Sequence, residues 1–284
     1  MPASGDPEPA ATVDWLAFCR RAGAAVRVAL EAYPTRAERE REVGRGEGGD
    51  MTLAIDAAAE DAIFAELESL GAPVTAISEE RGEVEIAGGG RTTVVIDPID
   101  GSLNAKRGLP FHAVSIAVAS TGLTPSTGGR TMGDVDVGYV LDLACGQEWT
   151  AIRGSGACLD GERLPRLEHA PLELIGIETA RPERVAAALE AIVATGASRV
   201  RAIGSVALTL CLVAAGSLDA MATLREVRSV DAAAAQLIVR EAGGAVAFPR
   251  GGDEPLAASL DLEMRSTVLA ARSSMLLDSL APLR

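Results

Sequence analysis

Apolar residues recur at two different spacings along the chain, and the spacing separates predicted helices from predicted strands. Over residues 13–33 they fall three or four positions apart, as on a helix with one buried face. Residues 51–71 predict a second helix, with Gly71 as its C-cap. Short apolar and β-branched runs predict strands in "APVTAISEE", "GRTTVVID" and "AVSIAVAS". "DVDVGYVLDL" and "GQEWTAIRG" predict two paired strands that turn at residues 144–146.

The pattern changes near residue 153, after which predicted strands and helices follow one another. Strands are predicted in "LELIGIE", "LDAMATL", "AVAF" and "STVLAARS", and helices in "RPERVAAALEAIVATG", "SVALTLCLVAAGS", "SVDAAAAQLIVREAGG" and "SMLLDSLAPL". This order is typical of an α/β or α+β layered sandwich. We therefore predict a disordered tail over residues 1–11, an N-terminal α+β half over residues 12–153, and a C-terminal α/β half over residues 154–284 that shares an interface with it.

Composition narrows the classes of partner. The 284-residue chain carries 40 acidic and 26 basic residues, a formal net charge of −14. Such a balance argues against non-specific binding to nucleic acid or to anionic membranes, because both need clustered Lys and Arg. No run of 18 apolar residues predicts a membrane span. The acidic, Pro-rich start "MPASGDPEPA" is unlike a signal peptide, so we expect a cytoplasmic location.

Two aspartates follow the predicted strand in "VVIDPIDGS". Asp97 ends the apolar run, Asp100 comes three residues later, and Pro98 between them prevents a regular strand from continuing. The chain should turn here, bringing Asp100 back toward Asp97 and freeing the carbonyl of Ile99. Two close, buried carboxylates repel each other unless a cation lies between them, and hard oxygen ligands suit Mg²⁺, Mn²⁺ or Ca²⁺. The alternative is an ordinary turn with solvated acids.

Two further acids can join this pair. Glu79 ends the predicted strand "APVTAISEE", and if that strand neighbours the one before Asp97, both acids emerge at the same sheet edge. Asp231 opens the helix "SVDAAAAQLIV" in the other half of the chain. For Asp231 the alternative is a first-turn acid that complements the helix dipole.

The residues after the turn indicate which kind of ligand the cation would help to bind. Gly101 and Ser102 begin "GSLNAKRG", which is long enough for one helical turn whose free N–H groups can bind an anion. Divalent cations beside such N–H groups predict a phosphoryl site where the cations neutralise phosphate oxygens and water attacks in line. The sequence shows neither a nucleophile paired with a His base nor a GxxxxGK[ST] loop.

The ordered motifs resemble the inositol monophosphatase family of Mg²⁺-dependent, Li⁺-sensitive phosphatases. "VVIDPIDGSLNAKRGLPFHAVSIAV" is similar to its first signature and "SVDAAAAQLIVREAGGAV" to its second, while "ISEERGE" is similar to its Gly-Glu-Glu element with Ser78 in place of the glycine. The resemblance extends from about Trp15 to Arg272. It implies an αβαβα sandwich, usually a homodimer, and two or three Mg²⁺ ions, with Mn²⁺ as a possible substitute.

The resemblance also implies a ligand set. Glu79, Asp97 and the Ile99 carbonyl would hold the first ion, and Asp97, Asp100 and Asp231 the second. A third, weaker ion would involve Glu79 and an acid of the preceding loop "GRGEGGD", Glu47 or Asp50. The equally weighted alternative is that this loop only connects its neighbours and provides no metal ligand.

Other matched positions carry roles toward water and substrate. Ser102, with Asp56 bonded to its hydroxyl, would help to activate the attacking water, and Glu79 belongs to the same catalytic group. Gly101 and Ser102 would donate N–H groups to phosphate, whereas Gly204 and Ser205, together with Asp231, would lie near the substrate. Val230 departs from the family, which usually has Trp there.

The substrate stays open between several phosphate esters. Inositol 1-phosphate is the first expectation, and fructose 1,6-bisphosphate follows because "GGDMTLAID", "GSLNAKRGLP" and "LDAMATLREVRSVD" resemble archaeal members that act on both. Arg225 and Arg228 would then meet a second phosphate, or else form a solvated charge pair. 3′-Phosphoadenosine 5′-phosphate ranks third because aromatic residues are few, and a non-catalytic binding protein is the remaining alternative.

Overall fold

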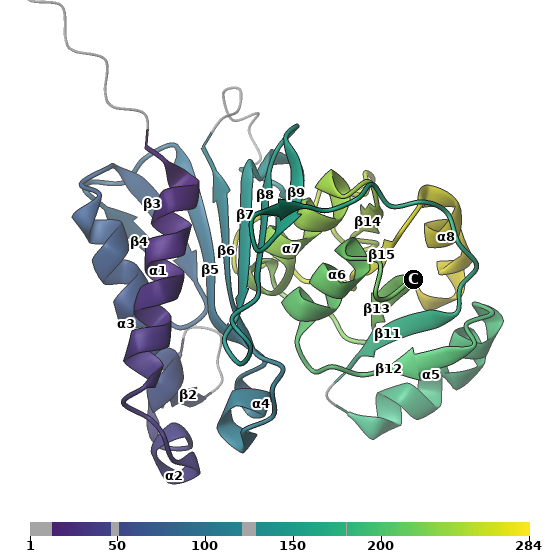
Figure 1. Cartoon of the computed structure of the whole chain (residues 1–284), viewed down its shortest axis with the longest axis horizontal. Coiled ribbons are helices and arrows are strands. Elements are labelled where there is room, and N and C mark those ends of the chain that lie inside the picture. The colour runs from purple at the N-terminus through teal and green to yellow at the C-terminus, as the bar shows by residue number, and fades with distance from the viewer. Residues whose placement is uncertain (1–12, 47–50, 121–128, 180) are drawn as a thin grey trace, which may run out of the picture.

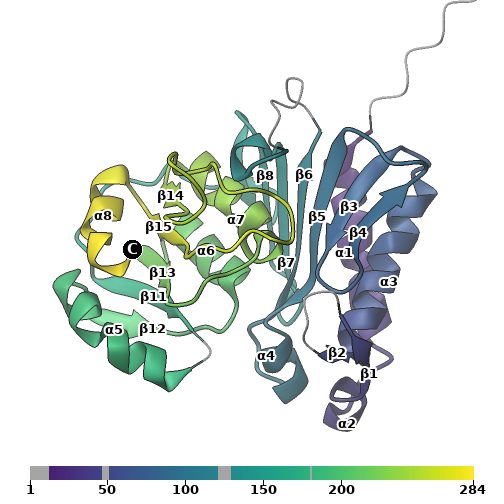
Figure 2. The same ribbon diagram turned by 180° about the vertical axis from the view of Figure 1, so that it is seen from behind.

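The computed structural model describes residues 13–46, 51–120, 129–179 and 181–284. The predicted tail and two acids of the predicted loop, Glu47 and Asp50, lie outside these residues. Apart from a small two-stranded sheet, the described chain forms two large sheets and three helical layers, which alternate across the molecule as an αβαβα sandwich (Figures 1 and 2), as predicted. None of the described helices is long and apolar enough to cross a bilayer.

The larger sheet has eight strands in the order β10-β9-β8-β7-β6-β5-β3-β4. Its strands are β3 (Val74–Ser78), β4 (Gly82–Ile86), β5 (Thr92–Asp100), β6 (Ala113–Ala119), β7 (Val137–Asp142), β8 (Glu148–Ile152), β9 (Gly156–Leu159) and β10 (Glu162–Arg163). All neighbours pair antiparallel except β3 and β5, which are parallel. The predicted neighbourhood of the two strands that end near Glu79 and Asp97 is therefore confirmed.

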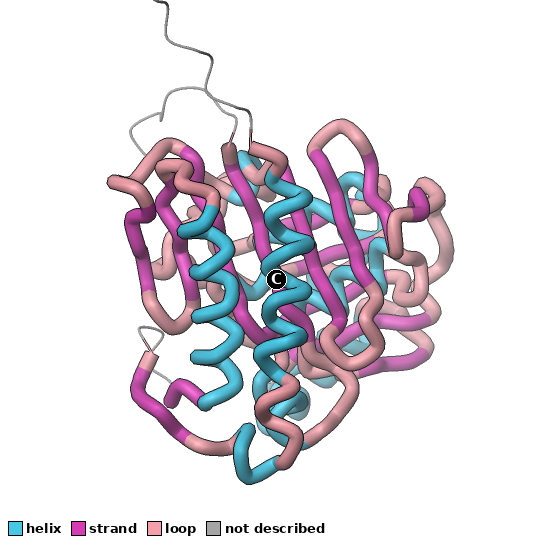
Figure 3. The backbone as a smooth tube through the Cα atoms, turned by 60° about the vertical axis from the view of Figure 1, so that its left-hand side comes forward, coloured by secondary structure: helices cyan, strands magenta, loops and turns pink. Residues whose placement is uncertain are grey.

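Helices α1 (Trp15–Leu30) and α3 (Ala54–Ser69) cover the outer face of this sheet, where Figure 3 shows them lying across the strands. Their apolar faces bury Phe18, Val26, Ile63 and Phe64 in one cluster with side chains of β5 and β6. The helix predicted to start at residue 51 starts at Ala54 instead. Residues Met51–Leu53 form β2, which pairs with β1 (Glu42–Arg45) after the short helix α2 (Arg36–Arg39).

The smaller sheet has five strands in the order β12-β11-β13-β15-β14. They are β11 (Leu174–Glu178), β12 (Arg199–Arg201), β13 (Ala220–Thr223), β14 (Ala245–Ala247) and β15 (Leu269–Ala271). Helices α5 (Pro182–Ala194) and α8 (Ser274–Ser279), with the 3₁₀ turn η2 (Ala281–Leu283), cover its outer face. The larger sheet itself runs on to Arg163, and the predicted division near residue 153 stays a prediction.

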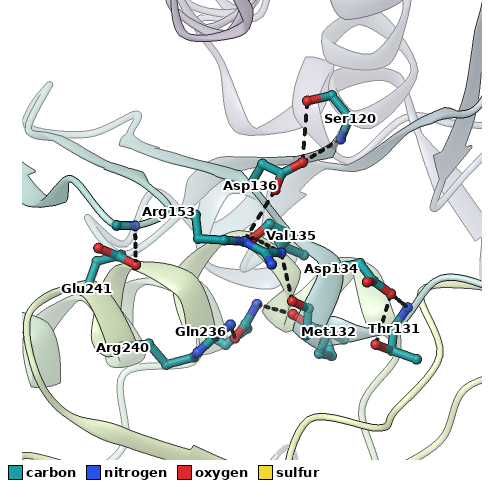
Figure 4. Close-up of polar contacts among 12 residues, drawn as sticks. Ser120, Thr131, Met132, Asp134, Val135, Asp136, Arg153, Gln236, Arg240 and Glu241 are labelled. Atoms are coloured by element: carbon teal, nitrogen blue, oxygen red, sulfur yellow. Dashed lines mark hydrogen bonds and ion pairs between the residues drawn. The ribbon is translucent and has the colours of Figure 1, made fainter. Parts of the chain in front are cut away.

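Helices α6 (Val206–Ala214) and α7 (Ser229–Glu241) fill the layer between the sheets. Four successive alanines make α7 thin enough to be buried on all sides, from Ser229 to Val239. At its closest approach a Cβ on Gly138 of β7 would lie 2.5 Å from the carbonyl oxygen of Ala234, so only glycine fits there. Beyond this contact, the side chains of Gln236 and Glu241 bond the 3₁₀ turn η1 (Met132–Asp134) and residues 154–156 (Figure 4).

Candidate metal and phosphate site

A bulge in β5 places the two aspartates on one side of the chain. The β5–β6 register pairs Asp97 with Ser115 but Asp100 with Ala113, so one extra residue is accommodated around Pro98. In a regular strand, residues three apart point to opposite faces, and a one-residue bulge reverses that relation. The predicted irregularity at Pro98 is therefore confirmed, although the strand resumes and ends at Asp100 rather than at Asp97.

Asp97, Asp100 and Asp231 meet across the interface between β5 and α7. One carboxylate oxygen from each lies within 4.8 Å of the others, and the three residues are only 1%, 6% and 5% exposed. The Oδ1 atom of Asp97 is buried without a hydrogen-bond partner. A buried carboxylate oxygen with no donor is costly unless a cation meets it, so this donor set fits a hard divalent metal ion.

Burial and repulsion from neighbouring carboxylates favour the protonated forms of Asp97 and Asp100. Burial raises the pKa of Asp97 well above its usual range, and Glu79, Asp100 and Asp231 raise it further. Burial likewise raises the pKa of Asp100 to about 7, with Asp231 as the next cause, against hydrogen bonds from Ser205 and Ala207. A bound divalent cation reverses this preference, because opposite charge favours the ionised form.

Asp231 lies both in the first turn of α7 and among the clustered carboxylates, the two positions that the sequence left open. Its Oδ2 accepts a hydrogen bond of 2.6 Å from the Arg228 N–H and so caps the first turn of α7. A second lone pair and the other oxygen remain available toward Asp97 and Asp100, where the group of three forms. The capping bond thus orients the carboxylate without using up its capacity as a ligand.

Glu79 lies beside the three aspartates but is held by an arginine. The Arg228 guanidinium forms an ion pair with the Glu79 carboxylate, and both side chains are largely buried. Burial raises the pKa of Glu79 to about 7, Arg228 opposes that rise, and Asp231 adds to it. Arg228 therefore faces the carboxylate group and is not part of a solvated charge pair, whereas its place at a second phosphate stays a prediction.

Asp56 and Ser102 occupy the other side of the bulge. Ser102 donates its hydroxyl to the Ile99 carbonyl at 2.8 Å, and it also lies close enough to Asp56 to lower the pKa of that acid. Burial dominates nevertheless and, with Glu80 and Glu79, raises the pKa of Asp56 to about 7. The Ile99 carbonyl, proposed as a ligand, is thus part of the same hydrogen-bonded group as the Ser102 hydroxyl.

Gly101 joins the two halves of the site at the start of α4 (Ser102–Arg107). Its φ of +90° is accessible to glycine, and an added Cβ would lie 2.7 Å from the Phe111 carbonyl and 3.3 Å from that of Gly204. Asn104 donates to the Phe111 and Ile203 carbonyls at 2.8 and 2.9 Å, which fixes this approach. The two glycine positions predicted to lie near phosphate and substrate are therefore in contact.

Ser205, the N-cap of α6, and Glu178, from the smaller sheet, complete the site. Ser205 donates its hydroxyl to Asp100, and Ala207 donates its N–H to the same oxygen at 2.7 Å. Glu178, the last residue of β11, accepts the Ile203 and Gly204 N–H groups at 2.9 Å. Sequence reasoning missed Glu178, although it is an acid at the carboxyl end of a strand, the same signal that pointed to Glu79.

Comparison with known proteins gives a consistent result over most of the chain. Residues 10–284 match the model of the inositol monophosphatase family. A fructose-1,6-bisphosphatase/inositol-1-monophosphatase of Methanothermobacter thermautotrophicus is 38% identical over 237 residues, 80% of each chain. An inositol-1-monophosphatase of Mesorhizobium japonicum is 33% identical, covering 73% of this chain and 76% of the relative.

Solved structures agree in fold. The structure of a gene product named inositol monophosphatase-fructose 1,6 bisphosphatase superposes with a TM-score of 0.77 at 28% identity, covering 96% of this chain and all of that one. The extragenic suppressor protein suhB of Bartonella henselae superposes with a TM-score of 0.76 at 26% identity, covering 96% of this chain and 99% of that one.

Proposed function

The chain belongs to the inositol monophosphatase family of phosphoric monoester hydrolases, and on that basis we propose that it is a Mg²⁺-dependent phosphatase of small phosphorylated polyols or sugars. The observation that carries the metal dependence is the buried group of Asp97, Asp100 and Asp231, whose oxygens lie within 4.8 Å of one another. The Arg228 guanidinium lies beside this group but is paired with Glu79, and a divalent cation among the three aspartates would offset their mutual repulsion.

The chain's residues fit two ions. Asp97 would contribute to both, Glu79 and the Ile99 carbonyl to one, and Asp100 and Asp231 to the other. Glu79 has to release Arg228 when it takes up this role, because the two side chains are paired in the structure. When bound, Mg²⁺ supplies neutralisation of phosphoryl charge and acidifies the attacking water. Mn²⁺ has the same preference for oxygen ligands.

Asp56 and Ser102 supply the proton transfer. Asp56 is buried at the start of α3, and its pKa of about 7 lets it accept a proton near neutral pH. The Ser102 hydroxyl donates to the Ile99 carbonyl and is near enough to Asp56 to lower the pKa of that acid, and by turning toward Asp56 it would pass a proton from water to the acid. The N–H groups of Gly101 and Ser102 at the start of α4 orient the phosphoryl oxygens, and Gly204 and Ser205 border the substrate from the opposite half.

Inositol 1-phosphate is our first candidate substrate. Fructose 1,6-bisphosphate is the second, supported by the relative named for both activities and by a Pyrococcus furiosus relative named fructose-1,6-bisphosphatase, 30% identical over 237 residues. We expect lithium sensitivity, a cytoplasmic location and a homodimer, as the family resemblance implies. A third ion and the loop acids Glu47 and Asp50 remain predictions.

Phosphate release on the two candidate esters tests the proposal. Wild-type protein is assayed in parallel on inositol 1-phosphate and fructose 1,6-bisphosphate, with Mg²⁺ and then with EDTA. We expect turnover that EDTA abolishes and that added Mg²⁺ restores. Turnover of the first ester alone indicates an inositol monophosphatase, and comparable turnover of both indicates dual specificity. Equal release with and without EDTA would refute the metal dependence.

A further inference from the structure

Four arginines from distant parts of the chain line one surface hollow of about 470 Å³. Arg184 lies on α5, and Arg225, Arg250 and Arg265 lie in loops. Strand pairing explains the convergence: the ends of β13 and β14 both lie beside Leu269, the first residue of β15. The loops that follow β13 and β14 and precede β15 therefore meet at one edge of the smaller sheet, where open sheets commonly bind ligands.

The charges in this hollow are not balanced within the protein. Only one acid, Glu226, lines it, and its carboxylate pairs with Arg250 at 2.6 Å. Arg225 donates to the main-chain carbonyl of Glu226 at 3.3 Å, and Arg184 donates to that of Leu224 at 3.3 Å. Arg265 donates only to main-chain carbonyls as well. Within the described part of the chain, none of these last three guanidinium groups has a carboxylate partner.

Such an arrangement is unusual in an acidic chain. With 40 acidic residues against 26 basic ones, an arginine has more carboxylates to pair with than it needs. Three unpaired guanidinium groups on one concave surface repel each other unless an anion lies among them. Each carries five N–H donors in a planar fork, and one bond to a carbonyl leaves several of them free, which matches the geometry of a phosphate group.

We propose that this hollow is a second anion site that binds a phosphoryl group, with Arg184, Arg225 and Arg265 as its donors. It shares Arg225 with the pair that the sequence suggested, but Arg228 is turned away to Glu79, and Arg184 and Arg265, which no motif singled out, take part instead. Two sources supply this chemistry: the second phosphate of a bisphosphate substrate, or a separate phosphorylated molecule. The first source rests on the function proposed above.

The hollow lies close to the catalytic residues without containing them. Arg225 is near enough to Glu178 to lower the pKa of that acid, and Glu178 holds the N–H of Gly204, which contacts the phosphate-binding turn at Gly101. Arg225 is also three residues before Arg228, the partner of Glu79. A ligand that spans both sites therefore passes over the Gly204 loop.

Titration with inorganic phosphate tests the site independently of catalysis. Calorimetry in EDTA is used because without divalent metal the carboxylates of the catalytic site repel phosphate. We expect wild type to bind phosphate, the double variant Arg184→Gln/Arg265→Gln to bind at least tenfold more weakly, and Arg163→Gln to bind as wild type does. Arg163 is a matched control, since it is exposed and donates to the Ser155 carbonyl at 2.8 Å.

Two results of this titration overturn the proposal. One is unchanged phosphate affinity in the double variant while its thermal unfolding matches wild type. The other is an equal loss in Arg163→Gln, which would show that only the net charge matters. The single variants Arg184→Gln and Arg265→Gln are each expected to lose part of the affinity, so the test stands if the double variant fails to fold.

Kinetics then distinguish the two sources. If the anion is the substrate's second phosphate, the double variant raises KM for fructose 1,6-bisphosphate at least fivefold and leaves KM for inositol 1-phosphate within twofold. If it is a separate molecule, both KM values stay unchanged although phosphate binding is lost. Should wild type hydrolyse neither ester, the proposed function fails, and the phosphate titration alone still decides whether the hollow is an anion site.

Discussion

The carboxylates at the two ends of α7 differ in how far they are satisfied by hydrogen bonds. At its start, Asp231 faces Asp97 and Asp100, and one buried oxygen of Asp97 has no donor. At its end, both oxygens of Glu241 accept main-chain N–H groups, from Gly154 and Gly156, each at 2.9 Å (Figure 4). The start of α7 therefore brings several carboxylates together, whereas at its end the negative charge of Glu241 is shared between two N–H donors.

The polar groups around the C-terminal end of α7 follow the same rule. Gln236 donates to the Met132 carbonyl at 3.0 Å and accepts from Arg240, while Asp136 pairs with Arg153 and accepts the Ser120 N–H at 2.7 Å (Figure 4). Satisfied polar groups of this kind link the central helix to the larger sheet. Unsatisfied ones at the other end cost stability and create the demand for a cation. Function and stability are thus separated along one helix.

The carboxylate-to-amide changes Asp97→Asn, beside the start of α7, and Glu241→Gln, at its end, should differ most in their effect on turnover. Asp97→Asn should lower phosphate release at least ~10³-fold, about 4 kcal/mol, because Asp97 would serve both ions. In EDTA its melting temperature should equal or exceed that of wild type, because the neutral amide cannot ionise beside Asp100 and Glu79. Both quantities are measured on purified protein, by phosphate assay and thermal unfolding. Near-normal turnover would refute the ligand assignment.

The second prediction concerns pH in the absence of metal. Asp56, Glu79 and Asp100 have folded pKa values of about 7, against ordinary values of 3.8 for Asp and 4.5 for Glu. Between these limits the folded chain binds more protons than the unfolded chain, so stability falls as pH rises from about 4 to about 7. The loss should be of the order of a few kcal/mol.

Denaturant unfolding in EDTA across this pH range measures the effect. Saturating Mg²⁺ should remove most of the fall, because bound cations favour the ionised carboxylates. Asp97→Asn should reduce the slope, whereas a change at Glu241 should leave it unaltered. A free energy of unfolding that rises with pH in EDTA would contradict the repulsion inferred at the start of α7.

The third prediction compares the loss of one hydroxyl group at the candidate site, from Ser102, with the loss of one near the end of α7, from Ser120. Ser102→Ala should lower turnover about 10- to 100-fold, or about 1.4–2.7 kcal/mol, by interrupting the path from water to Asp56. Its affinity for Mn²⁺, measured by calorimetry, should change little. Ser120→Ala removes a hydroxyl that bonds Asp136 and serves as the control with normal turnover. If Mn²⁺ binding collapses in Ser102→Ala, the serine is structural.

The smallest effect on turnover is expected for a change at Glu241. Glu241→Gln places an amide NH₂ against one of the two N–H groups and should destabilise the fold by about 1–3 kcal/mol. Turnover at 25 °C should stay within twofold of wild type, because no residue of the candidate site is altered. Urea unfolding and the phosphate assay measure the two quantities. Lost turnover with unchanged stability would show that the two ends of α7 are not independent.

Much of the fold could be predicted because local pattern and tertiary structure agree. The helices containing Phe18, Leu208 and Asp231 and the strands before Asp97 and after His112 lie close to where their periodicity places them. The edge strands were missed or misassigned. Residues 51–53 extend a helical pattern but pair with β1. Strand β4 begins at Gly82, is rich in charge and has no apolar run to reveal it. Such strands depend on a neighbour, which sequence does not supply.

The sequence by itself determined the chemistry of the candidate site. Pro98 in Asp-Pro-Ile-Asp-Gly-Ser interrupts the regular strand, as the sequence predicts, and the resulting bulge brings Asp97 and Asp100 to one side. Both facts follow from local backbone geometry and alternation, which act over a few residues.

Only the tertiary structure decided which distant groups meet. Asp231 joins the aspartates, Arg228 pairs with Glu79, and Glu178 supports the Gly204 loop. The four arginines of the hollow are separated by up to 81 residues, from Arg184 to Arg265, and meet because β13, β14 and β15 place their loops at one edge. Charge balance in a folded protein depends on such long-range contacts, which local pattern does not specify.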